Sequence, residues 1–512
     1  MKKTLTTLLA AAFCVAMSGQ VKVSVHENAS DQPVIPKEIY GQFAEHLGRC
    51  IYDGIWVGED SPIPNINGYR KDLVEAIREL KVPVLRWPGG CFADEYHWRD
   101  GIGPKADRPK MINSNWGGTV EDNSFGTHEF LNFCGMLGIE PYISGNVGSG
   151  TVEELAKWVE YMTAKGGTMA ELRAKNGRKE PWKVKYLGVG NESWGCGGNM
   201  TPEFYSDQYK RYAIYCRNYD GNRLYKVASG ASDYDYNWTK VLMQKVRGDI
   251  SGLSLHYYTV DWGKKGSATE FTDEDYYNVI AKAVEIDEVI KNHEAIMDLY
   301  DPNHRIDLLL DEWGTWYDVE PGTNPGHLFQ QNSMRDAIVA ALTLNIFNKH
   351  TDRLKMANIA QMVNVLQAMI LTKGSEIVLT PTYHVFRMFN VHQDAASVPV
   401  TFQTDSLASK SGRLYPTMSV SASKSEAIHV SLANPSVNES KTVELEFDAL
   451  KPSKVSGEVL VGKGKGIEAV KSYNDFNGKS VVAPAKFKDF KTSGKTVKVT
   501  LPPASVVVLE VK

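Results

Sequence analysis

The 512-residue chain lacks most of the short motifs that mark a metal, nucleotide or serine-based active site. It has no CxxC pair and no HExxH helix, so its spacing indicates no zinc site. It also has no GxSxG elbow and no P-loop. The segment Gly188–Ser193 resembles a dinucleotide fingerprint without its third glycine, which leaves an NAD-dependent enzyme only a distant alternative. We therefore expect neither a metal nor a cofactor.

Cysteine, net charge and long apolar runs are scarce as well. Of the six cysteines, five lie beyond residue 20, and an odd, scattered set in a large chain does not indicate a disulfide scaffold. The formal charge of −4 gives no reason to expect nucleic acid or an anionic membrane as a partner. Beyond the first 20 residues no apolar run is long enough to span a bilayer.

The first 18 residues look like a targeting segment rather than part of the fold. Met1-Lys2-Lys3 is a short basic region, and a mostly apolar stretch follows up to Met17. This pattern predicts a secretory signal peptide over residues 1–18 and an exported protein, periplasmic or extracellular. Lipid anchoring through Cys14 is a weaker alternative, because the residues before it make a poor lipobox.

Eight apolar runs of strand length alternate with stretches of helical periodicity between residues 37 and 380. The expected strands are Ile39–Leu47, Val82–Gly90, Glu140–Val147, Val184–Glu192, Leu224–Ser232, Gly252–Thr259, Ile306–Trp313 and Ala357–Val365. The expected helices are Tyr69–Leu80, Val152–Lys165, Pro202–Tyr219, Asp273–Leu299 and Asn332–Asn348, with Thr151 and Thr201 as N-caps. Eightfold alternation predicts a (β/α)₈ barrel, and a doubly wound open sheet is the alternative.

After residue 380 the pattern changes. All eleven tryptophans lie between Trp56 and Trp316, and the tail instead alternates apolar and polar residues, as in Ile428/Val430/Leu432. This period of two predicts a C-terminal antiparallel β-sandwich over residues 381–512. Residues 19–36 contain the similar alternation of Val21, Val23 and Val25, so we expect this N-terminal strand to join the C-terminal sandwich.

Two expected strands end on a glutamate next to tryptophan: Glu192, followed by Ser193 and Trp194, and Glu312, followed by Trp313. The C-terminal ends of barrel strands carry the active site of this fold, and a pair of carboxylates there indicates glycoside hydrolysis. Asp311 is a rival to Glu312. Because strand side chains alternate, we expect only one of the two to face the barrel interior, and we assign Asp311 a supporting role.

Other strand ends supply polar residues for a sugar. They are Glu45, Arg86 before Gly89-Gly90-Cys91, Asn191, His256, Tyr258 and Gln361. Trp194 and Trp313, with Trp316, are expected to form apolar walls and a platform for the sugar ring. Taken one at a time, several of these residues could have a purely structural role. Glu45 and Arg86 could form a buried ion pair, and His256 could be hydrogen-bonded inside the core.

As a set, these motifs resemble glycoside hydrolase family 51 of the α-L-arabinofuranosidase type. The resemblance spans nearly the whole mature chain and is carried by six segments: Phe43–Tyr52, Leu85–Phe92, Gly190–Glu192, Leu255–Tyr258, Asp311–Trp313 and Ala360–Asn364. It implies Glu192 as the general acid/base and Glu312 as the nucleophile. It also implies that Glu45, Arg86, Asn191, Tyr258 and Gln361 hold the arabinofuranose, and Cys91 matches a position lined by Asn or Cys in the family. The family further implies a jelly-roll-like C-terminal sandwich, no metal and frequent homo-oligomers.

The resulting hypothesis is a retaining, exo-acting α-L-arabinofuranosidase that removes terminal arabinose from oligosaccharides or polysaccharides such as arabinan and arabinoxylan. One alternative is a retaining endo-glycanase, an endoglucanase or xylanase, on the same barrel. The other is a carbohydrate-binding protein without catalysis, which would need the tryptophans but neither glutamate.

Overall fold

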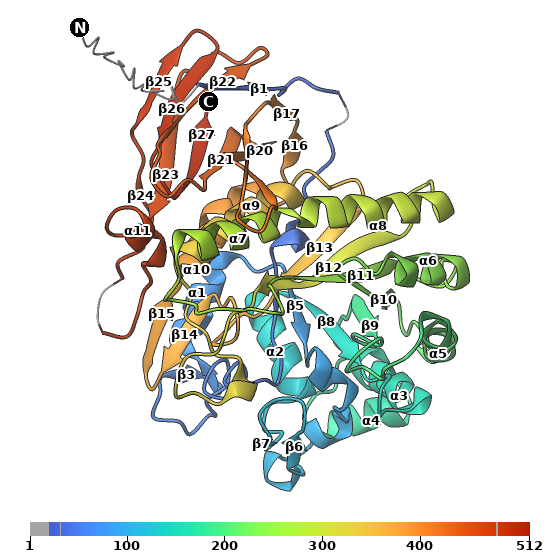
Figure 1. Ribbon diagram of the computed structural model, residues 1–512. Coiled ribbons are helices and arrows are strands. Elements are labelled where there is room, and N and C mark those ends of the chain that lie inside the picture. The colour runs from blue at the N-terminus through green and yellow to red at the C-terminus, as the bar shows by residue number, and fades with distance from the viewer. Residues whose placement is uncertain (1–19, 31, 478–479) are drawn as a thin grey trace, which may run out of the picture.

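A computed structural model describes residues 20–30, 32–477 and 480–512, so the predicted signal segment and Cys14 lie outside the described residues. The chain forms a barrel and a β-sandwich that packs against one side of it (Figure 1). Along the described ranges, no helix combines the length and the hydropathy required for a membrane crossing.

The barrel closes through eight parallel strands, as the sequence predicts, and the open-sheet alternative is wrong. In order around the barrel they are β2 (Gly41–Phe43), β5 (Val84–Trp87), β8 (Glu140–Gly145), β9 (Tyr186–Val189), β10 (Tyr225–Ser232), β11 (Gly252–Thr259), β12 (Asp307–Thr315) and β13 (Leu354–Ile359). β13 pairs with β2 and closes the ring. Both faces of these strands are covered, which explains why they appear in the sequence as continuous apolar runs.

The helices surround this ring. They are α1 (Lys71–Leu80), α2 (Thr127–Leu137), α3 (Val152–Thr163), α4 (Thr168–Lys175), α5 (Pro202–Tyr215), α6 (Tyr236–Lys245), α7 (Asp273–Val284), α8 (Ile286–Tyr300), α9 (Met334–Phe347) and α10 (Pro381–Phe389). The Thr151 and Thr201 side chains cap α3 and α5 by accepting from the backbone N–H groups of Glu154 and Phe204, as predicted. The single helix expected over Asp273–Leu299 is two helices, α7 and α8.

α10 belongs with the barrel helices. It contacts α9 and α1, and the Tyr383 hydroxyl donates to the backbone oxygen of Ala76 in α1. We therefore place the end of the barrel after Phe389 rather than at residue 380.

The sandwich has two sheets. One sheet has the order β17 (Val400–Phe402), β1 (Val21–Val25), β22 (Lys441–Phe447), β26 (Thr496–Leu501) and β25 (Phe490–Ser493). The other has the order β16 (Ala396–Val398), β20 (Ser419–Lys424), β21 (Ile428–Asn434), β27 (Ser505–Val511), β23 (Val455–Val461) and β24 (Ala485–Lys486). β1 runs parallel to β22, so the first sheet is mixed rather than wholly antiparallel. Short hairpins complete the fold: β3–β4 (Asn65–Ile66, Tyr69–Arg70), β6–β7 (Met111–Asn113, Thr119–Glu121), β14–β15 (Ile370–Lys373, Glu376–Leu379) and β18–β19 (Ser406–Ala408, Leu414–Pro416).

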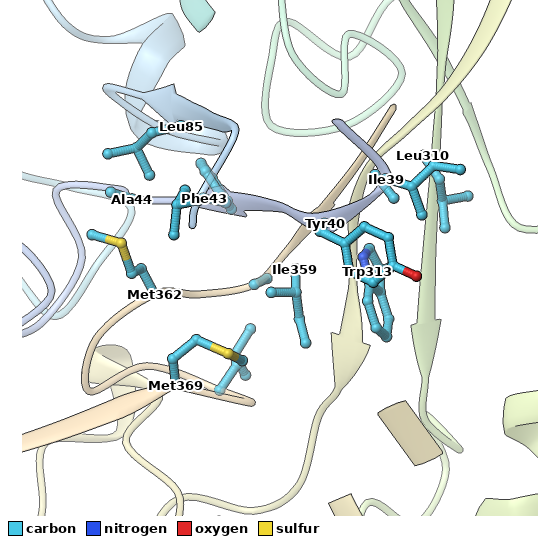
Figure 2. Packing of buried hydrophobic residues seen from close by; sticks show 14 of the residues in the cluster. Ile39, Tyr40, Phe43, Ala44, Leu85, Leu310, Trp313, Ile359, Met362 and Met369 are labelled. Carbon is cyan, nitrogen blue, oxygen red and sulfur yellow. The ribbon is translucent and has the colours of Figure 1, made fainter. Parts of the chain in front are cut away.

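α9 connects the barrel and the sandwich. All of its residues are buried, because one side contacts β12 and the other contacts β20, β21 and β27. The Asn345 side chain accepts from the hydroxyls of Ser421 and Ser431 on the sandwich. The largest cluster of buried apolar side chains contains Phe43, Leu310 and Trp313 (Figure 2).

Candidate active site

Glu192 and Glu312 meet at the C-terminal rim of the barrel. Glu192 follows β9, and Glu312 lies near the end of β12. One carboxylate oxygen of each lies within 4.8 Å of the other. Retaining glycosidases keep their two carboxyl groups about 5–5.5 Å apart, whereas inverting enzymes leave about 6.5–9.5 Å for a water molecule. The short separation fits the retaining arrangement.

Two donors hold the Glu312 carboxylate. Arg86, at the end of β5, donates from Nη1 to Oε2 at 2.8 Å, and the Tyr258 hydroxyl donates to Oε1 at 2.6 Å. Arg86 is itself fixed, because its Nη2 donates to the Asn191 side chain at 2.5 Å and its guanidinium lies over the Phe43 ring. Glu312 is therefore oriented by charge-assisted bonds on both oxygens, which suits an ionised nucleophile.

Both Asp311 and Glu312 face the barrel interior, contrary to the expectation that only one would. The register of β12 shifts against both neighbours: Ser254 and His256 of β11 pair with Leu309 and Glu312, so β12 carries one extra residue. Such a bulge turns two consecutive side chains to one face. Asp311 accepts from the Tyr142 hydroxyl at 2.6 Å and lies 3.8 Å from Arg86 Nε, so it holds the site from below.

Glu192 has an unusual backbone and a shielded side chain. Its φ is 40°, in the left-handed region that non-glycine residues rarely occupy. Its Oε1 lies 2.8 Å from Nδ1 of His256. Burial and the negative charge of Glu312 outweigh the hydrogen bond from His256, so the pKa of Glu192 is raised above its ordinary value. A carboxyl group with a raised pKa suits proton donation to a leaving oxygen.

His256 lies between three carboxylates. Its Nδ1 is also 3.5 Å from Glu312, and its Nε2 is 3.2 Å from Asp311. Burial alone would lower its pKa, but Glu312, Asp311 and Glu192 together raise it to about 10. The imidazole is therefore a cation at neutral pH, which places a fixed positive charge between the two catalytic candidates.

A second cluster surrounds Glu45, just after β2. Its carboxylate accepts from the Gln361 amide at 2.9 Å, the Phe92 backbone N–H at 3.1 Å and the Trp116 indole at 2.9 Å. Burial and the charge of Glu312 raise its pKa to about 7, although these three bonds oppose the shift. The carboxylate also lies against Gly89 and Gly90, where a Cβ atom would come within 2.9–3.0 Å of it. This close approach explains the two glycines after Arg86.

Asp94, a residue that our sequence reasoning missed, positions Asn191. Its carboxylate accepts from the backbone N–H groups of Asn191, Val147 and Gly148 at 2.8–3.1 Å. Burial raises its pKa to about 7 against these bonds. Nothing in the local sequence separates Asp94 from a surface acid. Sequence reasoning also missed Trp116 and Tyr142, because their partners, Glu45 and Asp311, lie far away along the chain.

Cys91 and Cys196 form a disulfide that the cysteine count did not suggest. It ties the segment after β5 to the segment after β9, and the Sγ atoms lie 4.0 Å (Cys91) and 3.5 Å (Cys196) from Oε2 of Glu192. The two residues are 105 positions apart, so sequence spacing could not pair them. Cys91 thus borders the catalytic acid candidate as part of a cross-link rather than as a thiol.

The tryptophans divide between site and core. The expectation that Trp313 forms a sugar platform is wrong, because its indole is buried and packs on Phe347 and Phe386. Figure 2 shows Trp313 among buried apolar side chains. The bulge places Glu312 inside, so the next residue turns outward into the helix layer. Trp316 instead packs edge-on against Tyr258, with ring centres 5.0 Å apart. Trp194 is half-buried, and its indole nitrogen has no partner among the described residues.

Glu192, His256 and Glu312 form a compact group that could in principle ligate a metal ion. The chemistry of the group opposes this. The pKa of His256 is raised, so its nitrogens carry protons, and both Glu312 oxygens already accept from Arg86 and Tyr258. The residues present fit a sugar better than a cation.

Comparison with known proteins shows close relatives. An intracellular exo-α-L-arabinofuranosidase of Bacteroides ovatus is 59% identical over 99% of this chain and 98% of its own length. The crystal structure of the GH51 arabinofuranosidase from Xanthomonas axonopodis pv. citri superposes with a TM-score of 0.93 at 47% identity, covering 96% of this chain and all of that one. An α-L-arabinofuranosidase from Thermotoga maritima, in an arabinose complex, gives 0.84 at 30% identity, covering 96% of this chain and 99% of that one.

The first of these relatives corrects the prediction of export. Its match includes 99% of this chain, and it is named as intracellular. A short basic region followed by an apolar stretch is therefore not sufficient here to indicate a signal peptide, and the lipoprotein alternative depended on the same segment.

Two family models match as well. The α-L-arabinofuranosidase 1 domain matches residues 76–279, and the α-L-arabinofuranosidase C-terminal domain matches residues 311–505. Between them they include both catalytic candidates. The chain belongs to glycoside hydrolase family 51, the α-L-arabinofuranosidases.

Proposed function

We propose that Glu192 is the general acid/base and Glu312 the nucleophile of a retaining, exo-acting α-L-arabinofuranosidase. The observation that carries the proposal is that a carboxylate oxygen of Glu312 lies within 4.8 Å of one of Glu192. The Glu312 carboxylate accepts hydrogen bonds on both oxygens, and the pKa of Glu192 is raised. The exo mode is supported by the Bacteroides ovatus relative, which is named an exo-enzyme.

In the first step Glu312 attacks the anomeric carbon while Glu192 protonates the departing oxygen. Arg86 and Tyr258 hold Glu312 in one orientation, so little reorganisation is needed as its charge moves into the new ester bond. His256 keeps Glu192 pointed toward Glu312.

In the second step Glu192 deprotonates the water that releases arabinose. The change of role has an electrostatic cause. The charge of Glu312 helps to raise the pKa of Glu192, and that charge disappears when Glu312 is esterified. The pKa of Glu192 then falls, which makes it a base when a base is required.

The arabinofuranosyl ring would be held by Glu45, Asn191 and Gln361, whose polar groups surround Glu312 and are buried. We propose terminal arabinofuranosyl residues on arabinoxylan, arabinan or their oligosaccharides as substrates. Barrel residues thus account for the chemistry, and we assign no catalytic residue to the sandwich.

The roles of Glu192 and Glu312 can be distinguished by how the loss of kcat/KM in each variant depends on the leaving group of the substrate. We expect Glu312→Ala to lower kcat/KM at least about 10⁴-fold on every arabinofuranoside, since no covalent intermediate can form. Glu192→Ala should lose about 10³-fold on an arabinosyl-oligosaccharide but far less on an activated nitrophenyl glycoside, whose leaving group needs no proton.

Glu203→Ala is the matched control, because Glu203 is an exposed glutamate at the start of α5. It should leave both rates unchanged. Equal losses for Glu192→Ala on activated and unactivated substrates would contradict the acid role.

A further inference from the structure

A cavity of about 300 Å³ lies beside the end of β11 and is lined by Thr259, Val260 and Trp316. Trp316 also packs on Tyr258, which donates to Glu312. The cavity and the site described above therefore share a neighbouring aromatic ring. The wall of the cavity also includes Lys265, Phe271, Tyr317 and Arg335, and we refer to it as the Arg335 cavity.

Arg335 is a buried cation without a carboxylate partner. Its side chain is 2% exposed, and the rings of Phe271 and Tyr317 stack on its two faces at 3.8 Å. Its Nη2 donates to the backbone oxygens of Ser267 and Ala268, whereas its buried Nε has no acceptor among the described residues. The two rings fix the orientation of this guanidinium, and its charge attracts an anion into the cavity that it lines.

The carboxylate of the adjacent Asp336 is bonded to other groups. Asp336 follows Arg335 directly, but its carboxylate accepts from the Ser333 backbone N–H and the Thr315 hydroxyl at 2.7 Å. No carboxylate among the described residues comes within 4.0 Å of the Arg335 nitrogens, the distance at which the other ion pairs of this chain are found.

Lys265 supplies a second unpaired cation, together with an aromatic corner. Its Nζ lies 5.3 Å and 5.0 Å from the ring centres of Trp262 and Trp316, and it has no acidic partner among the described residues. The two indoles are 5.2 Å apart at 65° to each other, and Trp262 is 57% exposed. Trp316 is partly buried and lines the cavity, and an exposed indole such as Trp262 beside it is suited to stacking on a sugar ring.

The other charges around the cavity are mostly balanced. Glu285 pairs with both Lys282 and Arg413, Asp275 with Lys264, and Glu270 with Lys471. Asp261 is the lining acid without a cation partner, and its side chain accepts from the Gly263 backbone N–H. The unpaired charges at the cavity are therefore two cations, Arg335 and Lys265, and one acid, Asp261, so their net charge is positive.

We propose that the Arg335 cavity binds a hexuronic acid, with its carboxylate at Arg335 and Lys265 and its ring against Trp262 and Trp316. A carboxylate would balance the charge of the guanidinium that lines the cavity, and the aromatic corner selects a sugar over a simple anion. The binding of a hexuronic acid does not depend on the proposed function. The further step, that this acid belongs to the polysaccharide from which the enzyme removes arabinose, rests on the proposed function.

The test is a ligand-observed NMR titration of the full chain with sodium D-glucuronate, D-glucuronamide and sodium acetate. Glucuronamide keeps the ring and removes the charge, and acetate keeps the charge and removes the ring. We expect glucuronate to bind at least about tenfold more tightly than either, as for one charge-assisted contact and one stacked ring. Lys265→Met and Trp262→Ala should each weaken glucuronate binding about tenfold.

Lys105→Met is the matched control, because Lys105 also lies over a tryptophan, Trp56, but outside the cavity. It should bind glucuronate as the wild type does. Equal affinity for glucuronate and glucuronamide, or an unchanged affinity in Lys265→Met, would overturn the proposal. Equal affinity for acetate would overturn the sugar specificity. Because binding is measured without an arabinoside, these outcomes do not depend on whether Glu192 and Glu312 catalyse hydrolysis.

Discussion

At the scale of residues, three glutamates in one site have different environments. Glu312 accepts from a cation and a hydroxyl, Glu192 pairs with His256 at a partly exposed edge, and Glu45 is enclosed by three neutral donors. Their sequence positions predicted that they would meet at one rim. Which of them is held ionised depends on partners such as Arg86 and Tyr258, which sequence alone could name only through a family resemblance.

Tyr258→Phe tests how much the hydroxyl on the nucleophile contributes. It removes the 2.6 Å bond to Glu312 and leaves the ring that packs on Trp316. We expect kcat/KM for a nitrophenyl arabinofuranoside to fall about 10²-fold, typical of losing one preorganised donor.

Tyr257→Phe is the internal control for this variant. The adjacent Tyr257 points outward, and its hydroxyl donates to the Lys282 backbone oxygen. That variant should lose about 1 kcal/mol of stability and little activity. Similar kinetic losses in both variants would show that the effect is structural.

At the scale of elements, strand positions were predictable and local irregularities were not. The eight barrel strands appear as apolar runs because both of their faces are buried. The extra residue in β12 leaves no signal in the sequence, yet it turns both Asp311 and Glu312 inward and sends Trp313 into the core. The helix predicted over Asn332–Asn348 is α9, and it is buried along its whole length rather than amphipathic.

The Cys91–Cys196 cross-link should stabilise the two rim segments. It closes a loop across 105 positions, for which chain entropy alone gives about 4.7 kcal/mol, and disulfides typically contribute about 2–4 kcal/mol. We expect the Cys91→Ser/Cys196→Ser double variant to unfold at a lower denaturant concentration than the oxidised wild type. A reductant should lower the wild-type midpoint and leave that of the double variant unchanged. Identical midpoints for the two proteins without reductant would contradict the assignment.

His350, just after α9, should make stability depend on pH. It lies 2.8 Å from Asp287 and 3.0 Å from Glu294 of α8, and these acids raise its pKa to about 9 despite its burial. A raised histidine pKa adds stability that is complete below about pH 6.5 and is lost as the pH rises through about 9.

Unfolding of wild type and His350→Asn at pH 6 and pH 10 measures this contribution. The difference in unfolding free energy between the two proteins should be about 1–2 kcal/mol larger at pH 6, allowing for solvent screening at Asp287. The same difference at both pH values would show that the ion pairs do not stabilise the fold.

At the scale of the whole molecule, α9 packs the barrel against the sandwich, whose interior forms a hydrophobic cluster of its own. The Asn345 bonds to Ser421 and Ser431, and the contacts of α9 with both parts, make independent unfolding costly. We expect a single calorimetric transition for the full chain. Two separated transitions would show that the interface contributes little.

The central claim is that hydrolysis proceeds in two displacements, with Glu312 as nucleophile and Glu192 as acid/base. The most direct test is the reaction of the Glu192→Ala variant with a nitrophenyl α-L-arabinofuranoside in the presence of azide, in which the product is identified. Azide needs no general base, so it should attack the arabinosyl-Glu312 ester from the face opposite Glu312. NMR should then identify α-L-arabinofuranosyl azide, with the configuration of the substrate retained. The β-azide, or no azide product from a folded variant, would contradict these roles.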